Sequence, residues 1–181
     1  VSRKIPYTAR GAGTNLSGGC IPLRGGVVIS LARMNRILQI DTAKGLAVVE
    51  PGLVNQTLQR ALEPLGFFYA PDPASLKVST IGGNISENAG GPRCLKYGVT
   101  SNHVLALEAA MPDGSLQRFN IDDPGPELAS LLVGSEGTLG IVTKAWVKIT
   151  PIPEQIRTFL AGAGCQEILT YSLLSPEMIA R

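Results

Sequence analysis

The sequence predicts an α+β fold, and three observations support this prediction. Candidate strands outnumber candidate helices, the candidate helices are short, and the two kinds of element do not alternate as they do in a parallel α/β sheet. The 181 residues are 44% hydrophobic and 17% charged, a composition that can bury the core of one domain. We therefore expect a folded domain that is built mainly from strands.

Short strands are expected in the first part of the chain. Residues 5–8 resemble a strand, and the apolar run 27–31 is typical of a buried one. Residues 37–40 and 46–49 lie on either side of a polar turn, so we expect them to pair as a hairpin.

Two helices are expected. Leucines at helical spacing predict a helix over 54–65, with Asn55 as its N-cap and Gly66 just past its end. A second, shorter helix is predicted over 128–133. Helices are thus few and short beside the strands.

The second half of the chain supplies the longer strands. Residues 104–111 and 116–119 flank the turn sequence Pro-Asp-Gly-Ser, which predicts a hairpin. Residues 141–149 alternate between apolar and polar side chains, as in a strand with one buried face.

Charge, hydropathy and cysteine content exclude several classes of protein. The formal net charge of +2 argues against a dedicated nucleic-acid binder. No apolar run approaches the ~18 residues of a transmembrane helix. Cys20, Cys94 and Cys165 are odd in number and far apart, so they indicate no disulfide framework and favour a reducing compartment such as the cytoplasm.

A domain boundary is expected near Pro151-Ile152-Pro153. Two prolines in three residues stop a strand and stiffen a linker. We expect a domain over 1–153, incomplete at its N-terminus, and the start of a second, truncated domain over 154–181. In this last stretch glycine is sparse, and an amphipathic pattern is formed by Ile168, Leu169, Leu173 and Leu174.

The first candidate binding motif is Arg10-Gly-Ala-Gly-Thr-Asn-Leu-Ser-Gly-Gly19, directly after a strand. Successive backbone N–H groups in such a loop can form a concave anion site, and a pyrophosphate suits it. The motif is not a P-loop and not a clean dinucleotide fingerprint. The alternative, a glycine-rich turn without a ligand, is equally compatible with this segment alone.

The second candidate motif combines residues 71–75 with residues 80–92, in which two Gly-Gly pairs flank small polar residues. The alternative for this segment is a long irregular loop without a ligand, although loops of this length are more often functional than idle. With few bulky side chains, the segment could lie against a flat aromatic ligand.

The third candidate motif is Gly134-Ser-Glu-Gly-Thr-Leu-Gly-Ile-Val-Thr143, again just before a strand. Glu136 could accept hydrogen bonds from ribose hydroxyls. The alternative is a tight turn with a solvated glutamate.

Other catalytic schemes find little support in the sequence. His103 is the only histidine, so a multi-histidine metal site is excluded, and a structural role for His103 is favoured. We therefore predict no metal site. We interpret Cys94 as a packing residue. Lys96 and Tyr97 could contact a cofactor, and the equally favoured alternative is a solvent-facing lysine and a packed tyrosine.

Taken together and in this order, these motifs resemble the FAD-linked oxidase family, whose FAD domain is of the vanillyl-alcohol-oxidase or p-cresol-methylhydroxylase type. The segments that carry the resemblance are residues 10–19, 71–75, 80–91, 96–100 and 134–143. Within the family, the chain is most similar to the glycolate oxidase and D-lactate dehydrogenase group. The resemblance covers residues 5 to 153.

The resemblance implies two α+β subdomains with FAD held non-covalently between them. It assigns the pyrophosphate to the first loop, the flavin and ribityl chain to residues 74–80 and 82–90, and the ribose and adenine end or the isoalloxazine edge to residues 136–142. The implied FAD-binding residues are Arg10, Gly11, Ala12, Gly13, Thr14, Asn15, Ser17, Ala74, Ser75, Thr80, Gly82, Gly83, Asn84, Asn88, Gly90, Glu136, Gly137, Gly140, Ile141 and Val142.

The family's activity gives the expected function. It implies oxidation of a D-2-hydroxy acid such as glycolate or D-lactate, with hydride transfer to flavin N5, a base that takes the hydroxyl proton, and an electron acceptor other than NAD. Other oxidase subunits are possible partners. The catalytic residues are expected in a cap domain that lies beyond this sequence, so the chain alone is expected to be inactive.

Two alternatives stay open at this point. One is a nucleotide-binding or flavin-binding module without redox activity of its own. The other is a flavin reductase of the cell-wall type, whose loops differ more from residues 88–91 and 134–140.

Overall fold

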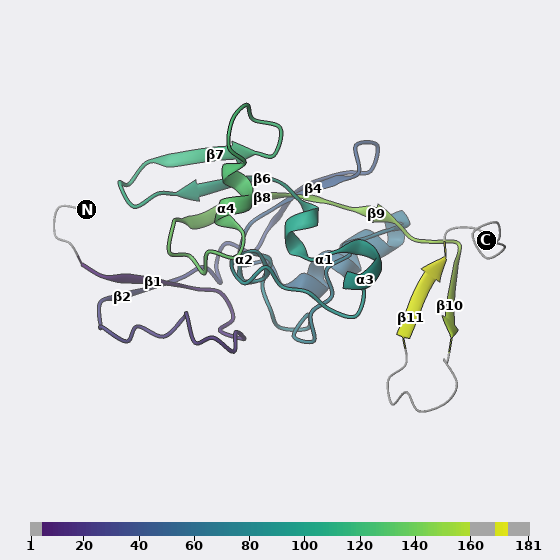
Figure 1. The fold of residues 1–181 in the computed structure, drawn as a ribbon, viewed down its shortest axis with the longest axis horizontal. Coiled ribbons are helices and arrows are strands. Elements are labelled where there is room, and N and C mark those ends of the chain that lie inside the picture. Colours follow the sequence, from purple (N-terminus) through teal and green to yellow (C-terminus); the bar gives the residue numbers. More distant parts are fainter. Residues whose placement is uncertain (1–4, 160–168, 174–181) are drawn as a thin grey trace.

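The fold centres on an antiparallel sheet (Figure 1). The computed structural model describes residues 5–159 and 169–173. The sheet has five strands in the order β3-β4-β8-β6-β7, and each neighbouring pair is antiparallel. Its strands are β3 (Ile37–Asp41), β4 (Leu46–Val49), β6 (Val104–Ala110), β7 (Leu116–Asn120) and β8 (Ile141–Lys148).

The core lies between this sheet and short helices. The helical elements are α1 (Asn55–Leu62), α2 (Ile81–Ser86), α3 (Cys94–Tyr97) and α4 (Leu128–Leu132), with the 3-10 turns η1 (Glu63–Leu65) and η2 (Thr100–His103). Side chains of α1, α2 and α4 pack with the inward-facing residues of the sheet. The buried residues of this cluster include Leu58, Leu62, Ile81, Ile85, Ala129 and Leu132 from the helices and Ala47, Val49, Leu107, Ala145 and Val147 from the strands.

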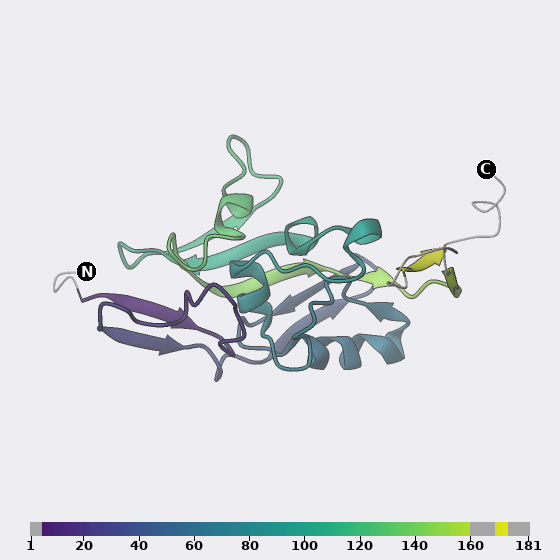
Figure 2. The ribbon, with the colours of Figure 1, turned by 60° about the horizontal axis from the view of Figure 1, so that its bottom comes forward.

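Three two-stranded sheets complete the described part of the chain. In the first, β1 (Tyr7–Arg10) and β2 (Val27–Ser30) are parallel. The other two are antiparallel and pair β5 (Phe67–Phe68) with β9 (Thr150–Pro151) and β10 (Gln155–Phe159) with β11 (Leu169–Leu173). Figure 2 shows the β1–β2 pair at one end of the molecule and the β10–β11 hairpin at the other.

The α+β class and both predicted hairpins are confirmed. The strand expected over 27–31 also forms, as β2, but the expectation that it is buried is wrong. Val27, Val28 and Ile29 are 51%, 41% and 36% exposed. Among the described residues β2 pairs only with β1, in a two-stranded sheet that leaves these side chains accessible to solvent.

The predicted first helix differs from the observed one at both ends. α1 begins at Asn55, and Val54 precedes it without a side-chain cap, so the prediction that Asn55 is the N-cap is wrong. The buried Asn55 side chain instead donates from Nδ2 to the carbonyl of Pro71 at 3.1 Å. The α-helix gives way to the 3-10 turn η1 after Leu62, and Gly66 ends it in the left-handed conformation, with φ 74°.

The second candidate motif is not the long irregular loop that was the alternative for residues 80–92. Residues 81–86 form α2, with Thr80 as its N-cap: the Thr80 Oγ1 accepts a hydrogen bond from the Gly83 N–H at 3.3 Å. Two glycines inside six residues weaken helix propensity, which hid the helix in the sequence. Tertiary packing of Ile81 and Ile85, both fully buried, stabilises it.

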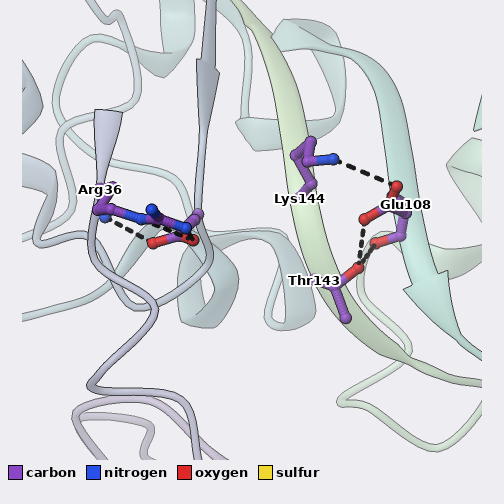
Figure 3. A network of polar contacts seen from close by, with 5 residues as sticks. Arg36, Glu108, Thr143 and Lys144 are labelled. Atoms are coloured by element: carbon purple, nitrogen blue, oxygen red, sulfur yellow. Dashed lines mark hydrogen bonds and ion pairs between the residues drawn. The ribbon is translucent and has the colours of Figure 1, made fainter. Parts of the chain in front are cut away.

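Polar side chains join strands within the central sheet, as Figure 3 shows. Arg36 precedes β3 and Glu50 follows β4, and Arg36 Nη2 lies 2.8 Å from Glu50 Oε1. Arg36 lowers the pKa of Glu50 from 4.5, mainly through its side-chain hydrogen bond and secondly through the hydrogen bond from its backbone N–H. Across β6 and β8, the Glu108 carboxylate accepts from Thr143 at 3.0 Å and from Lys144 at 3.3 Å.

Some expectations concern residues outside the described ones. Cys165 and the outer positions of the predicted amphipathic pattern, Ile168 and Leu174, are among them, as is much of the expected second domain over 154–181. In the part of the chain that the structure describes, no helix is long and apolar enough to cross a membrane.

Candidate functional site

The candidate site is a cavity of about 310 Å³ where all three glycine-rich motifs meet. The loop after β1 forms one wall, the helix α2 with the residues before it forms another, and Glu136 closes a side. These segments lie far apart in the sequence, so only the fold brings them together. A cavity of this size, with walls from several elements, is typical of a small-molecule site.

The loop after β1 presents unpaired backbone donors to this cavity. Among the described residues, no backbone N–H of residues 11–17 donates a hydrogen bond to another part of the chain. Gly13 has φ +73°, a conformation that glycine adopts without strain. Consecutive free N–H groups in a turning loop form an anion site, so the loop can hold a phosphate or pyrophosphate group.

Close approach of the loop to α2 depends on a second glycine. A Cβ at Gly11 would lie 2.3 Å from Thr80 Oγ1, which leaves no room for a side chain. The N-cap of α2 and the anion loop are therefore in contact, and both line the cavity.

Buried polar groups without partners also mark the site. The Asn84 side chain on α2 is 2% exposed and that of Ser79 is 3% exposed, and both residues line the cavity. Asn84 Nδ2 and Ser79 Oγ make no hydrogen bond within the described chain. Because an unsatisfied buried polar group costs about 1–3 kcal/mol, these two atoms indicate a ligand that supplies their partners.

The third motif enters the cavity through one residue. Glu136 has φ +53°, an uncommon conformation for a residue other than glycine. Its backbone N–H donates to the carbonyl of Ser86 at 2.9 Å, which ties the loop to the end of α2. Its carboxylate lies beside Gly19, where a Cβ would come within 2.8 Å of Oε2.

The charges around the cavity do not by themselves favour an anion. Of the described residues that line it, Arg10 is the only basic one, whereas Glu87 and Glu136 are both acidic. The Arg10 guanidinium lies against the loop, since a Cβ at Gly13 would be 3.1 Å from Nη2. Binding of a pyrophosphate would therefore depend mainly on backbone N–H groups, with Arg10 as the supporting cation.

The structure brings most of the sequence-predicted site residues together. Those that line the cavity are Arg10, Gly11, Ala12, Gly13, Thr14, Asn15, Ser17, Ser75, Thr80, Gly82, Gly83, Asn84 and Glu136. Those that lie outside it are Ala74, Asn88, Gly90, Gly137, Gly140, Ile141 and Val142.

The residues outside the cavity have visible structural roles. Ile141 and Val142 begin β8 and are only 9% and 6% exposed in the core. Asn88 has φ +47°, and its Oδ1 accepts from the Ser101 N–H at 2.9 Å. A Cβ at Gly90 would lie 2.7 Å from Cys94 Sγ, so this glycine permits close packing behind the cavity.

Sequence reasoning left out several cavity residues. They are Ala9, Leu16, Gly19, Cys20, Leu31, Ser79, Ser86, Glu87 and Ala89. Five of them, Leu16, Gly19, Ser86, Glu87 and Ala89, lie inside the motifs but were not named as binding residues. Ala9, Cys20 and Ser79 are adjacent to a motif, so wider motif boundaries would have included them. Leu31 is different: its N–H donates to the carbonyl of Arg10 at 2.9 Å, and only the parallel pairing of β1 with β2 places it there.

Asp72 and His103 have perturbed pKa values, and neither of them lines the cavity. Burial raises the pKa of Asp72 from 3.8, and Arg93 opposes this shift with an ion pair at 3.3 Å. Burial lowers the pKa of His103 from 6.5, and its hydrogen bond to the Tyr97 carbonyl opposes this. Lys96 and Tyr97 also lie outside the cavity.

A cavity with free backbone N–H groups and unpaired buried polar atoms is typical of a domain that binds a phosphate-containing cofactor, and comparison with known proteins identifies the cofactor. The family model described as "FAD binding domain" matches residues 1–120. The chain belongs to this FAD binding domain family, and FAD is its cofactor.

Curated relatives and a solved structure agree with this assignment. The chain is 50% identical over 162 residues to the glycolate oxidase subunit GlcD of Bacillus subtilis (strain 168), covering 87% of this chain and 34% of the relative. It is 40% identical over 157 residues to a D-lactate dehydrogenase of Anaerostipes hadrus, covering 84% and 33%. A solved alkyldihydroxyacetonephosphate synthase matches with a TM-score of 0.77 and 28% identity, over 87% of this chain and 32% of that one.

These matches confirm the expected fold class, an α+β FAD-binding domain. The chain spans about a third of the length of the curated relatives that it matches. The site residues fit FAD: free N–H groups suit its pyrophosphate, and the unpaired atoms of Asn84 and Ser79 suit its polar groups.

Proposed function

We propose that the chain is the FAD-binding part of an oxidoreductase that oxidises a D-2-hydroxy acid such as glycolate or D-lactate. The observation that carries the proposal is the cavity itself, an anion loop facing buried unpaired polar atoms. Similarity to a glycolate oxidase subunit and a D-lactate dehydrogenase supports the substrate class. When bound, the flavin supplies an acceptor for the hydride of such a substrate.

The roles of individual residues follow from their places in the cavity. The backbone of residues 11–17, with Arg10, would hold the pyrophosphate. Asn84 Nδ2 would donate a hydrogen bond, and Ser79 Oγ can donate or accept one. Glu136 would accept hydrogen bonds from ribose hydroxyls. Residues 74–80 and 82–90 would extend along the flavin and its ribityl chain. Residues 136–142, which include Gly137, Gly140 and the start of β8, would lie near the ribose and adenine end or along the isoalloxazine edge.

We also propose that the FAD-binding domain ends at residue 153. The pairing of β9 with β5 keeps residues 150–151 within the main body. β10 and β11, by contrast, pair only with each other among the described residues. Residues 154–181 would then begin a second domain. An electron acceptor other than NAD and further oxidase subunits are the proposed partners.

Reconstitution with FAD tests this function. The chain purified with added FAD should be yellow and should show the absorption bands of a bound oxidised flavin. Acid precipitation should release all flavin into the supernatant, because no residue is proposed to bind it covalently. A yellow pellet would contradict non-covalent binding, and a colourless protein that binds ADP but no flavin would favour a nucleotide-binding module instead.

A further inference from the structure

The C-terminal end of α2 is the point to which both the first and the third glycine-rich loops attach. The carbonyls of Ile85 and Ser86 accept hydrogen bonds from the N–H groups of Gly134 and Glu136, each at 2.9 Å. The next residue, Glu87, reaches the first loop with its side chain. The geometry of the cavity therefore depends on this one helix end.

Glu87 contacts the anion loop through two side chains rather than through the backbone. Its Oε1 accepts from Asn15 Nδ2 at 3.0 Å and from Ser17 Oγ at 3.1 Å. The Asn15 amide is held on its other side as well, because Cys20 Sγ donates to its Oδ1 at 3.4 Å. The side chains of Asn15 and Ser17 are thus engaged with the protein, while the backbone N–H groups of residues 11–17 make no hydrogen bond within the described chain.

We propose that Glu87 is a positioning residue that holds the anion loop in its pyrophosphate-binding conformation by bracing Asn15 and Ser17. This inference rests on the proposed FAD-binding role of the loop. Hydrogen bonds to an ionised carboxylate are stronger than those between neutral groups, so one side chain can fix a loop that is otherwise open to solvent. The brace lowers the conformational entropy that the loop loses when the ligand binds.

The alternative is that the Glu87 carboxylate occupies the anion site itself and competes with the ligand. An acidic side chain in a phosphate-binding cavity would suit that role. A competitor, however, would sit on the backbone N–H groups of residues 11–17, and within the described chain none of them donates to Glu87. The contacts therefore favour bracing.

Two substitutions distinguish the effect of the hydrogen bonds that Glu87 makes from the effect of its negative charge. Glu87→Ala removes the brace. Glu87→Gln removes the charge but keeps one oxygen that can accept from Asn15, and its amide can donate to the Ser17 hydroxyl. Glu154→Ala is the matched control, because it removes a carboxylate that is exposed and makes no hydrogen bond or ion pair among the described residues.

The first measurement is the affinity of the 181-residue chain for FAD and for ADP, by calorimetric titration. We expect Glu87→Ala to weaken both by about tenfold, the scale of one lost charge-assisted hydrogen bond. Glu87→Gln keeps the geometry with weaker, neutral hydrogen bonds, so it should weaken binding less than Glu87→Ala does, and Glu154→Ala should leave the affinity unchanged. Tighter or unchanged binding by Glu87→Ala would overturn the proposal and favour competition or no role.

The second measurement does not depend on FAD. The rate at which iodoacetamide alkylates Cys20, resolved from the other cysteines by peptide mass spectrometry, reports the mobility of Asn15. Glu87→Ala should raise this rate several-fold and Glu87→Gln should not. An unchanged rate in Glu87→Ala would overturn the brace.

The two measurements also separate this inference from the proposed function. A wild-type chain that binds neither FAD nor ADP would contradict the proposed function. The alkylation rates would still decide whether Glu87 braces the loop. Unfolding curves of each variant establish that any loss of affinity is not a loss of fold.

Discussion

Gly13 is a position in the anion loop where a side chain would disturb both the backbone and the neighbouring Arg10. Its φ of +73° is unfavourable for residues with a Cβ, and a Cβ there would lie 3.1 Å from the Arg10 guanidinium. A side chain would change the direction of the neighbouring N–H groups and displace the one basic residue at the cavity. The loop is exposed, so the core does not depend on it.

Gly13→Val should therefore abolish measurable FAD binding while the fold persists. The left-handed backbone conformation costs about 1–2 kcal/mol for an L-residue, which sets the expected loss of unfolding free energy. Flavin titration and urea unfolding measure the two effects separately.

A second glycine provides the control for backbone strain. Gly25 has φ +68°, has no atom within 4 Å of a Cβ built on it, and does not line the cavity. Gly25→Val should lose a similar amount of stability and keep its FAD affinity. If Gly13→Val bound FAD as tightly as wild type, the loop would not belong to the site.

His103 is a second residue whose environment predicts a measurable property. Its Nε2 lies 2.8 Å from the Tyr97 carbonyl, which can only accept, so Nε2 carries the proton. Nδ1 is buried and has no partner among the described residues. A proton added there would have no acceptor, in agreement with the lowered pKa, whose main cause is burial.

This histidine should make stability fall between neutral and mildly acidic pH. Because the folded-state pKa lies below 6.5, the unfolded chain binds the proton first as the pH falls. The free energy of unfolding should decline from about pH 7 toward the folded-state pKa and then level off. Urea unfolding at a series of pH values measures this slope.

The slope should be absent in His103→Gln, which cannot titrate. The same slope in wild type and in this variant would show that another group causes it. Glu50 is not that group. Its pKa is lowered from 4.5, so the folded protein takes up a proton at Glu50 only at a more acidic pH.

At the scale of elements, α2 lines the cavity, and its C-terminal end contacts two of the glycine-rich loops. It can approach Pro51, which follows β4, because Gly82 has no side chain: a Cβ there would lie 2.6 Å from Pro51 Cβ and 2.9 Å from the Pro51 carbonyl oxygen. At the next position, Gly83, the nearest atom is Thr80 Oγ1 at 3.2 Å. The two adjacent glycines are thus under different steric constraints.

Gly82→Ala and Gly83→Ala should therefore differ in stability. Overpacking against Pro51 should cost Gly82→Ala about 1–3 kcal/mol of unfolding free energy. Gly83→Ala gains helix propensity of about 1 kcal/mol, so it should be neutral or stabilised once Thr80 shifts slightly. Denaturant unfolding of both variants measures this, and equal losses would mean that α2 is not packed as described.

The same helix shows where sequence reasoning stops. The regular strands and hairpins were predictable because alternation and turn residues are local signals, as at 104–111 and 116–119. α2 was not, because packing of Ile81 and Ile85 overrides the low propensity of its glycines. The exposure of β2 was not predictable either, since an apolar run does not reveal whether a second layer covers it.

At the scale of the whole molecule, the cavity exists because the fold joins three segments that the sequence separates. The motifs themselves were visible, and most of the residues named from them line the cavity. The contacts between motifs could not be predicted from the sequence. The hydrogen bond that Asn15 donates to Glu87 joins residues 72 positions apart, and Leu31 reaches the site through strand pairing. Residue type indicates which groups can bind FAD, but only tertiary structure shows which of them meet.

The distribution of functional groups also bears on what the chain can do alone. Its cavity provides the means to hold FAD, yet substrate oxidation also needs a base and groups that orient the hydroxy acid. Orientation can account for about 7–11 kcal/mol of a reaction barrier. The chain spans about a third of the length of its curated relatives, so groups of this kind can lie in the other two thirds of those proteins.

We therefore expect the 181-residue chain, loaded with FAD, to show only background activity in dye-linked assays with glycolate, D-lactate and D-2-hydroxyglutarate. His103, the only imidazole, is buried and bound to a backbone carbonyl, and Glu87 is engaged with Asn15 and Ser17. Neither is free to take a proton from a substrate. Saturable turnover that disappears in His103→Ala or Glu87→Gln, while FAD stays bound, would place the catalytic base within this chain and contradict the division between cofactor binding here and substrate binding elsewhere.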